Sequence, residues 1–235
     1  MTTAKKENIL SLNLSHCINI PDDFEGYSKD VFCIPKYYED SLSTVLVPKG
    51  MILDRIDCLA RDIFRDIITA CEEPEPLVSL CVLKGGYKFF SDLQDRINDL
   101  NSNHKKSVPM RVEFMRLKSY ENTESAGEVQ IVGVSSEELF NLKGKNVLVI
   151  EDMVDTGKTM QKLLTTLRRY EPKRIYVACL LRKRTPLSDG YVPDYVGFEI
   201  PNKFVVGYAI DYNEYFRDLR HICLINDNGI RKYRS

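Results

Sequence analysis

Two adjacent carboxylates, Glu151 and Asp152, stand at the end of the apolar run 147–150 and just before a loop of small and hydroxyl-bearing residues. That loop consists of Asp155, Thr156, Gly157, Lys158 and Thr159. Where a strand turns into a helix at such a loop, unpaired backbone N–H groups and the helix dipole favour an anion. The threonine hydroxyls add donors, and the glycine lets the backbone approach a ligand closely. The segment therefore predicts a phosphate-binding loop.

The two carboxylates need a partner of their own, because they would otherwise repel the phosphate. Vicinal sugar hydroxyls and Mg2+ both fit between them and the phosphate. A P-loop is excluded, since the G-x-x-x-x-G-K-S/T pattern requires glycine where Asp152 stands. In a simpler interpretation, an aspartate caps the helix and Glu151 is merely solvated, but this explains only part of the run. We expect a sugar-phosphate site.

The elements that position this loop alternate between apolar strands and amphipathic helices. Strands are predicted at 77–83, 108–117, 129–133, 146–152, 174–181, 194–200, 203–208 and 221–225, and helical apolar stripes span 52–67, 89–100 and 160–167. This alternation favours a parallel sheet covered on both faces, which binds ligands at the carboxyl ends of its strands. The polar stretch 118–130, with Gly127, predicts a mobile loop.

Composition and charge exclude several other classes of protein. Lys and Arg number 33 against 34 Asp and Glu, so the net charge of -1 gives no overall attraction to nucleic acid or to an anionic membrane. No uncharged apolar stretch approaches the roughly 18 residues of a membrane span. The 7 cysteines never form C-x-x-C, which argues against a disulfide scaffold or a zinc site. The N-terminus lacks an unbroken apolar region, so we expect a cytoplasmic protein with no nucleic-acid or membrane partner.

The run 147–159 resembles the phosphoribosyl-diphosphate (PRPP) motif of the type I phosphoribosyltransferases. Four further segments resemble the hypoxanthine-guanine phosphoribosyltransferases in sequence and order: 81–90, 116–120, 180–186 and 198–219. The resemblance covers about residues 30–235. It implies an α/β, type I phosphoribosyltransferase fold, with a mostly parallel, twisted sheet flanked by helices and a small base-binding hood. We therefore expect one domain at 31–235, preceded by a loosely ordered extension at 1–30.

The resemblance also implies how PRPP is bound. Lys84 and Gly85 would bind its pyrophosphate through their backbone, after a cis peptide bond between Leu83 and Lys84. Arg217 would contact the pyrophosphate, and Asp211, which also belongs to the purine site, would ligate a second Mg2+.

Ribose and its 5′-phosphate would be held on the neighbouring strand. Glu151 and Asp152 would bind the ribose hydroxyls and their associated Mg2+, and the loop 155–159 would hold the 5′-phosphate. Ser119 and Tyr120 would begin a mobile lid that closes over the reacting atoms and excludes water.

The purine site is implied by residues from later segments. Lys183 would read the base, because an ammonium group offers only donors and therefore accepts the O6 carbonyl of hypoxanthine or guanine. Phe204 would stack on the ring, Val205 would contact its edge through the backbone, and Lys203 would belong to the same site. Asp155 would be the catalytic residue, taking or stabilising the N7 proton.

Together these features predict an Mg2+-dependent enzyme that transfers 5-phosphoribosyl from PRPP to N9 of hypoxanthine or guanine, giving IMP or GMP and pyrophosphate. The family implies a homodimer or homotetramer. One alternative is a non-catalytic PRPP- or nucleotide-binding regulator of the same fold, against which the near-zero net charge and the intact carboxylate set argue. A receiver-type domain would also carry acidic strand ends, but it would not explain Lys183, Phe204 and Asp211.

Overall fold

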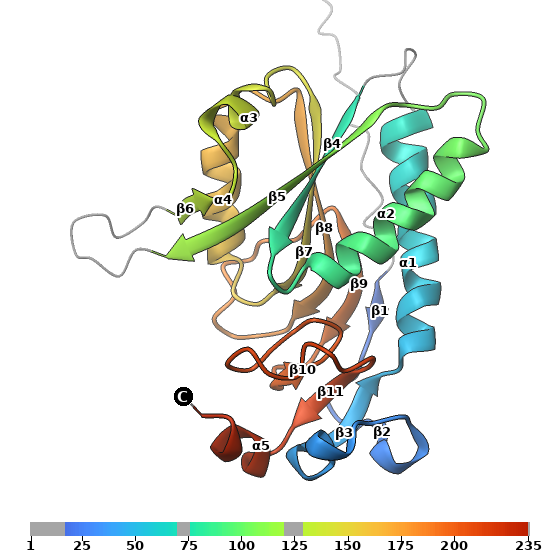
Figure 1. Cartoon of the computed structure of the whole chain (residues 1–235), viewed down its shortest axis with the longest axis vertical. Coiled ribbons are helices and arrows are strands. Elements are labelled where there is room, and N and C mark those ends of the chain that lie inside the picture. Colours follow the sequence, from blue (N-terminus) through green and yellow to red (C-terminus); the bar gives the residue numbers. More distant parts are fainter. Residues whose placement is uncertain (1–16, 70–75, 120–128, 235) are drawn as a thin grey trace, which may run out of the picture.

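The apolar runs of the sequence form a twisted seven-stranded sheet (Figure 1). The structure, a computed structural model, describes residues 17–69, 76–119 and 129–234. The strands of this sheet are β1 (Ile18–Asn19), β4 (Leu77–Leu83), β5 (Met110–Ser119), β6 (Val129–Val132), β7 (Asn146–Val154), β8 (Arg174–Lys183) and β9 (Tyr195–Ile200). Their spatial order is β1-β9-β8-β7-β4-β5-β6, and every pair is parallel except β5 with β6. The predicted mostly parallel sheet is confirmed.

Helices cover both faces of the sheet. One face is covered by α1 (Lys49–Ile63) and α2 (Tyr87–Ser102), and the other by α3 (Ser136–Phe140) and α4 (Lys158–Arg168) (Figure 1). Helix α1 continues into a π-helical segment at Phe64–Thr69. Successive strand residues point to opposite faces. In β7, Leu148 and Ile150 belong to the core under α1 and α2, whereas Val147 and Val149 belong to the core under α4. Central strands buried on both sides are apolar throughout, which is why they appear as runs.

A second, antiparallel sheet forms the hood. Its strands, in spatial order, are β10 (Val205–Val206), β11 (Ile222–Ile225), β3 (Leu42–Val47) and β2 (Tyr27–Ser28), and α5 (Asp227–Lys232) follows β11. Figure 1 shows this sheet beyond the end of the central sheet toward which β4 runs. The predicted strand 203–208 is shorter than expected, because Gly207, Tyr208 and Ala209 all have positive φ and turn the chain.

The N-terminal segment differs from the loosely ordered extension that we expected for residues 1–30. Within its described part, β1 pairs in parallel with β9, and β2 pairs antiparallel with β3, so the segment belongs to both sheets. Two-residue strands carry no periodic pattern, which is why the sequence did not reveal them. Residues 1–16, and most of the predicted mobile loop at 118–130, lie outside the described residues. Among the helices in the described ranges, none combines the length and apolarity needed to cross a bilayer.

Candidate active site

The carboxyl ends of β4, β7 and β8 meet at one edge of the sheet, where the residues predicted to be functional follow each strand. Lys84 and Gly85 follow β4, the loop 155–159 follows β7, and Lys183 is the last residue of β8. The peptide bond between Leu83 and Lys84 is cis, as the resemblance implied. Parallel packing thus assembles one site from separate segments.

The carboxylate pair of β7 is half-buried and short of positive charge. The Asp152 N–H donates to Glu151 Oε1 at 3.1 Å, and the Met153 N–H donates to Asp152 Oδ1 at 2.6 Å. Burial raises the pKa of Glu151 well above its usual range, and the neighbouring Asp152 raises it further. Burial likewise raises the pKa of Asp152. No lysine or arginine in the described part of the chain forms an ion pair with either residue.

This donor set fits Mg2+. A Mg2+ ion is bound by one or two carboxylates and completes its octahedron with water and substrate phosphates. A closed protein cage is not needed, and the described ranges contain no cluster of three or more His, Cys, Asp or Glu residues able to hold a metal ion. Two desolvated carboxylates beside a phosphate loop are what such an ion requires from the protein.

Gly85 and Asp152 touch across two strands. A Cβ built on Gly85 would lie only 1.6 Å from Asp152 Oδ2, so no other residue fits here without displacing that carboxylate. The absence of a side chain at Gly85 therefore lets the turn after β4 and the Asp152 carboxylate lie in direct contact.

The predicted phosphate-binding loop 155–159 lines a cavity of about 180 Å³ at the start of α4. Gly157 is the N-cap residue with φ +89°, and no side chain caps the helix, so the suggestion that an aspartate caps it is wrong. A Cβ on Gly157 would lie 2.2 Å from Asp189 Oδ1, and the Asp189 N–H donates to the Thr156 carbonyl at 2.9 Å. The lining residues are Glu151, Met153, Val154, Asp155, Thr156, Gly157, Thr159 and Met160.

Lys158 is the loop residue that the structure does not bring into this cavity. Its side chain lines a separate groove along α4 with Gln161 and Lys162. Consecutive helical residues project about 100° apart, so Lys158 and Thr159 face different surroundings. Ser119 is the last residue of β5, and Tyr120 lies outside the described residues.

The structure brings the predicted catalytic and base-reading residues together. Lys183 Nζ lies 3.3 Å from Asp155 Oδ2. The Lys183 side chain is only 10% exposed, whereas that of Asp155 is 48% exposed. The ion pair therefore joins a nearly buried lysine at the end of β8 to a solvent-exposed carboxylate in the loop after β7. Phe204 is half-exposed and meets Tyr212 edge-on at 5.4 Å, and Val205 is buried in β10.

Lys203, which was predicted to belong to the purine site with Phe204, is turned toward the N-terminal segment instead. Its Nζ donates to the carbonyl of Phe24, in the N-terminal segment, at 2.9 Å. The Lys203 side chain therefore binds the N-terminal segment, whereas the neighbouring Phe204 is exposed.

Arg217 and Asp211, which are predicted to bind the pyrophosphate and its Mg2+, are paired with each other. Arg217 Nη2 lies 2.8 Å from Asp211 Oδ1, and Asp211 Oδ2 accepts the Glu214 N–H at 2.8 Å. Burial has the largest effect on the pKa of Asp152 and raises it, and hydrogen bonds with Glu151 and the Met153 N–H lower it. To a smaller extent, Arg217 lowers that pKa and Asp211 raises it. The charges of Arg217 and Asp211 are therefore felt at the carboxylate pair.

Glu214 is a site residue that sequence reasoning missed. Its carboxylate bridges two predicted pyrophosphate ligands, with Oε2 2.6 Å from Lys84 Nζ and Oε1 3.3 Å from Arg217 Nη2. The residue sits at φ +72°, in a turn that faces the end of β4. Its position three residues before Arg217 was the available signal, but the partnership with Lys84 depends on the fold.

A parallel sheet with an antiparallel hood, and an acidic strand end before a phosphate loop, are the features of a phosphoribosyltransferase. Residues 48–213 match the family described as "Phosphoribosyl transferase domain". The chain is 55% identical over 216 residues to "Hypoxanthine-guanine phosphoribosyltransferase" of Homo sapiens (92% of this chain, 96% of the relative). It is 53% identical over 221 residues to the Mus musculus enzyme of that name (94% and 98%).

A solved structure agrees with these relatives. The "Hypoxanthine-guanine phosphoribosyltransferase from Schistosoma mansoni in complex with IMP" superposes with a TM-score of 0.77 at 42% identity, covering 93% of this chain and 99% of that one. The chain belongs to the hypoxanthine-guanine phosphoribosyltransferase family. The fold and the family implied by the sequence motifs are thereby confirmed.

Proposed function

We propose that this chain transfers the 5-phosphoribosyl group of PRPP to N9 of hypoxanthine or guanine, releasing pyrophosphate and giving IMP or GMP. The observation that carries the proposal is the contact between Lys183 and Asp155 at 3.3 Å, which joins a donor-only base reader to the phosphate loop. The names of its relatives, and the IMP bound in the Schistosoma mansoni structure, support the same substrates.

PRPP is held from both of its phosphate ends. Backbone N–H groups of the loop 155–159 bind the 5′-phosphate at the start of α4, and the backbone of Lys84 and Gly85 binds the pyrophosphate. Glu151 and Asp152 bind the ribose hydroxyls and would hold one Mg2+ ion, whereas Asp211 would hold a second Mg2+ ion on the pyrophosphate. Bound Mg2+ supplies positive charge that offsets the charge developing on the departing pyrophosphate. Arg217 contacts that same leaving group.

The base is selected and activated by the Lys183–Asp155 pair. The Lys183 ammonium donates to O6 of a 6-oxopurine and would meet the amino group of adenine donor to donor. Asp155 holds the proton at N7 of the base as N9 attacks the ribose carbon. Because the Lys183 side chain is almost buried, a mismatched base leaves its ammonium group with a desolvated N–H that has no acceptor on the base, which sharpens selection.

The alternative, a non-catalytic regulator of the same fold, is not favoured, because relatives that are 53–55% identical to this chain carry the name of the enzyme. A protein that only bound PRPP would gain nothing from Asp155, whose negative charge opposes the phosphate. We further propose a cytoplasmic homodimer or homotetramer that binds neither nucleic acid nor membrane.

A spectrophotometric assay of hypoxanthine, guanine and adenine with PRPP and Mg2+ tests the function. We expect turnover of the two oxopurines only. In Lys183→Gln, loss of a charged hydrogen bond worth about 1.5–3 kcal/mol should raise the KM of the base about 10- to 100-fold and leave the KM of PRPP nearly unchanged. Lys143→Gln, which removes an exposed ion pair with Glu171, serves as the control. Turnover of no purine would favour the regulator, and collapse of PRPP binding alone would assign Lys183 to the phosphate site.

A further inference from the structure

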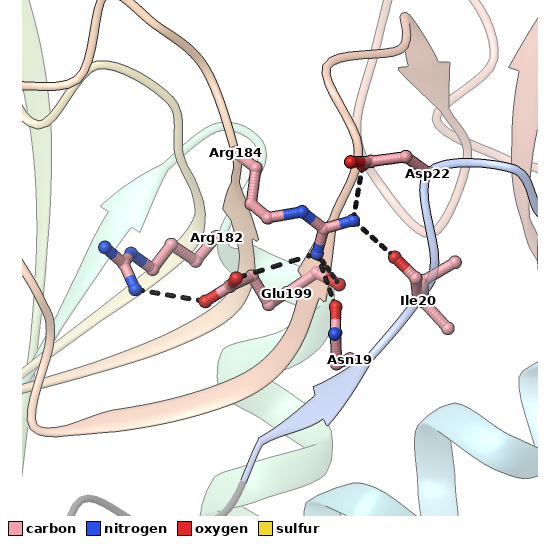
Figure 2. A network of polar contacts seen from close by, with 6 residues as sticks. All are labelled: Asn19, Ile20, Asp22, Arg182, Arg184 and Glu199. Carbon is pink, nitrogen blue, oxygen red and sulfur yellow. Dashed lines mark hydrogen bonds and ion pairs between the residues drawn. The ribbon is translucent and has the colours of Figure 1, made fainter.

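Arg184, the residue after Lys183, clamps three strands of the sheet together (Figure 2). Its guanidinium reaches across β9 to the N-terminal strand β1 and to the residues that follow it. There Nη2 donates to the Ile20 carbonyl at 2.5 Å and to Asp22 Oδ1 at 2.7 Å, and Nη1 donates to Asn19 Oδ1 at 2.5 Å. Nη1 also donates to the Glu199 carbonyl at 3.3 Å. Four acceptors on two neighbouring segments thus bind one side chain.

The Glu199 carboxylate completes the clamp from the strand between them. Its Oε2 lies 3.0 Å from Arg182 Nη1, and its Oε1 lies 3.6 Å from Arg184 Nη1. The three side chains are only 21–28% exposed, so the network is stronger than an ordinary surface ion pair. Arg182 and Arg184 flank Lys183, and because strand side chains alternate, Lys183 points to the opposite face, toward Asp155.

The same N-terminal segment supports the other wall of the purine site. Lys203 Nζ donates to the Phe24 carbonyl at 2.9 Å, immediately before the exposed ring of Phe204. Residues 19–24 are therefore bound on one side to the strand that bears Lys183 and on the other to the loop that bears Phe204. This N-terminal segment lies outside residues 48–213, which match the family domain.

We propose that the N-terminal segment 19–24 is a built-in support of the purine site, and that Arg184 is a positioning residue that fixes Lys183 through it. The inference rests on the proposed role of Lys183 in reading the base. β8 ends at Lys183, where strand pairing would otherwise fray, and the Arg184 N–H extends the pairing by one bond, to the Ile200 carbonyl at 2.8 Å. The clamp holds that strand end rigid from the face opposite the base.

Arg184→Gln tests this proposal, with Arg96→Gln as the matched control. Arg96 also links two elements, through a contact of 2.8 Å to Asp57 between α2 and α1, but it touches no residue of the site. For each protein we would measure the KM of guanine, the KM of PRPP, kcat and thermal melting. Small misplacements at a site can cost up to about 10²-fold, so we expect Arg184→Gln to raise the KM of guanine about tenfold. The KM of PRPP should change less than about twofold, and Arg96→Gln should alter neither constant.

A second variant removes acceptors of the Arg184 guanidinium and keeps Arg184 itself. Asn19→Ala combined with Asp22→Ala removes two acceptors of Arg184 and leaves its own strand intact. It should raise the KM of guanine in the same direction. Adding Arg184→Gln to it should raise that KM by less than the product of the separate effects, because the same contacts are lost.

The outcomes separate the positioning role from the function itself. An unchanged KM of guanine in folded Arg184→Gln, or equal rises in both KM values, would refute the positioning role. If Arg184→Gln fails to fold, the Asn19→Ala and Asp22→Ala variant decides, and an unchanged KM of guanine there refutes it. Lys183→Gln is measured alongside. If only that variant raises the base KM, the base-reading role of Lys183 stands and the positioning role of Arg184 is refuted. An unchanged base KM in Lys183→Gln refutes the base-reading role of Lys183, whereas the function itself is refuted only if the wild-type protein turns over no oxopurine.

Discussion

Replacing Gly85 with alanine should disable the PRPP side of the site without unfolding the protein. The added Cβ would lie 1.6 Å from Asp152 Oδ2, and an ordinary contact begins at 3.4 Å, so the carboxylate must retreat by the difference, about 1.8 Å. The backbone has less freedom to move, because β4 is paired with β5 up to Leu83. The retreat breaks the 2.6 Å hydrogen bond from the Met153 N–H. Since a misplacement of about 1 Å can cost 10²-fold, we expect kcat/KM for PRPP to fall at least about 10²-fold.

The measurement compares Gly85→Ala with Gly50→Ala in steady-state kinetics with Mg2+ and in thermal melting. Gly50 lies near the start of α1, and apart from its chain neighbours and the backbone of its own helix no atom lies within 4 Å of a Cβ built on it. Alanine there should stabilise the fold by about 0.5–1 kcal/mol and leave the kinetics unchanged. If folded Gly85→Ala keeps kcat/KM for PRPP close to the wild-type value, the reasoning from the Asp152 contact is refuted.

Three further predictions concern single side chains. Asp155→Asn should bind PRPP and melt normally but lose about 10²–10⁴ in kcat, and full kcat would remove the proton-holding role. Glu214→Gln should bind pyrophosphate severalfold tighter in calorimetry, because Lys84 loses its internal carboxylate partner; weaker binding would instead make Glu214 a positioning residue. Burial lowers the pKa of His221, whose neutral Nδ1 accepts the Lys49 N–H at 2.9 Å, so its contribution to stability is full above pH 6.5 and is lost as the pH falls through the lowered pKa. In His221→Phe, urea midpoints from pH 5 to 8 should lack that loss; an identical pH dependence would refute the assignment.

The parts of the fold predicted well are those whose signal is local. The strand β7 and its loop were visible because an apolar run ends at carboxylates and is followed by Gly157 at a helix start. The end of the predicted strand 203–208 was wrong for a non-local reason. Tyr208 and Ala209 hold left-handed angles, which cost energy in residues other than glycine. Their N–H groups bind the carbonyls of Leu219 and Arg217, partners that the local sequence does not reveal.

In the candidate site, too, residues placed by local sequence patterns were predicted, and contacts between distant parts of the chain were not. The sequence motifs placed Lys183 and Asp155 at the ends of two strands, and because the strands are parallel these ends lie at one edge of the sheet, where the structure pairs the two side chains. The direction of Lys203 depends instead on Phe24, 179 residues away in the chain. Glu214 contacts Lys84 across 130 residues. Contacts of this kind depend on how the hood sits against the sheet, and a single sequence does not encode them locally.

The pairing of β1 with β9 also affects how the protein is made. Ile18 aligns with Phe198, so the two partners lie 180 residues apart in the chain. At about 5–20 residues per second, a ribosome completes β9 roughly 10–40 s after β1. β4, β5 and β7 can pair during that interval, whereas β1 has no partner until β8 and β9 emerge. The purine site is therefore completed late in synthesis, and a nascent chain stopped before β9 would carry the phosphate loop without its N-terminal support.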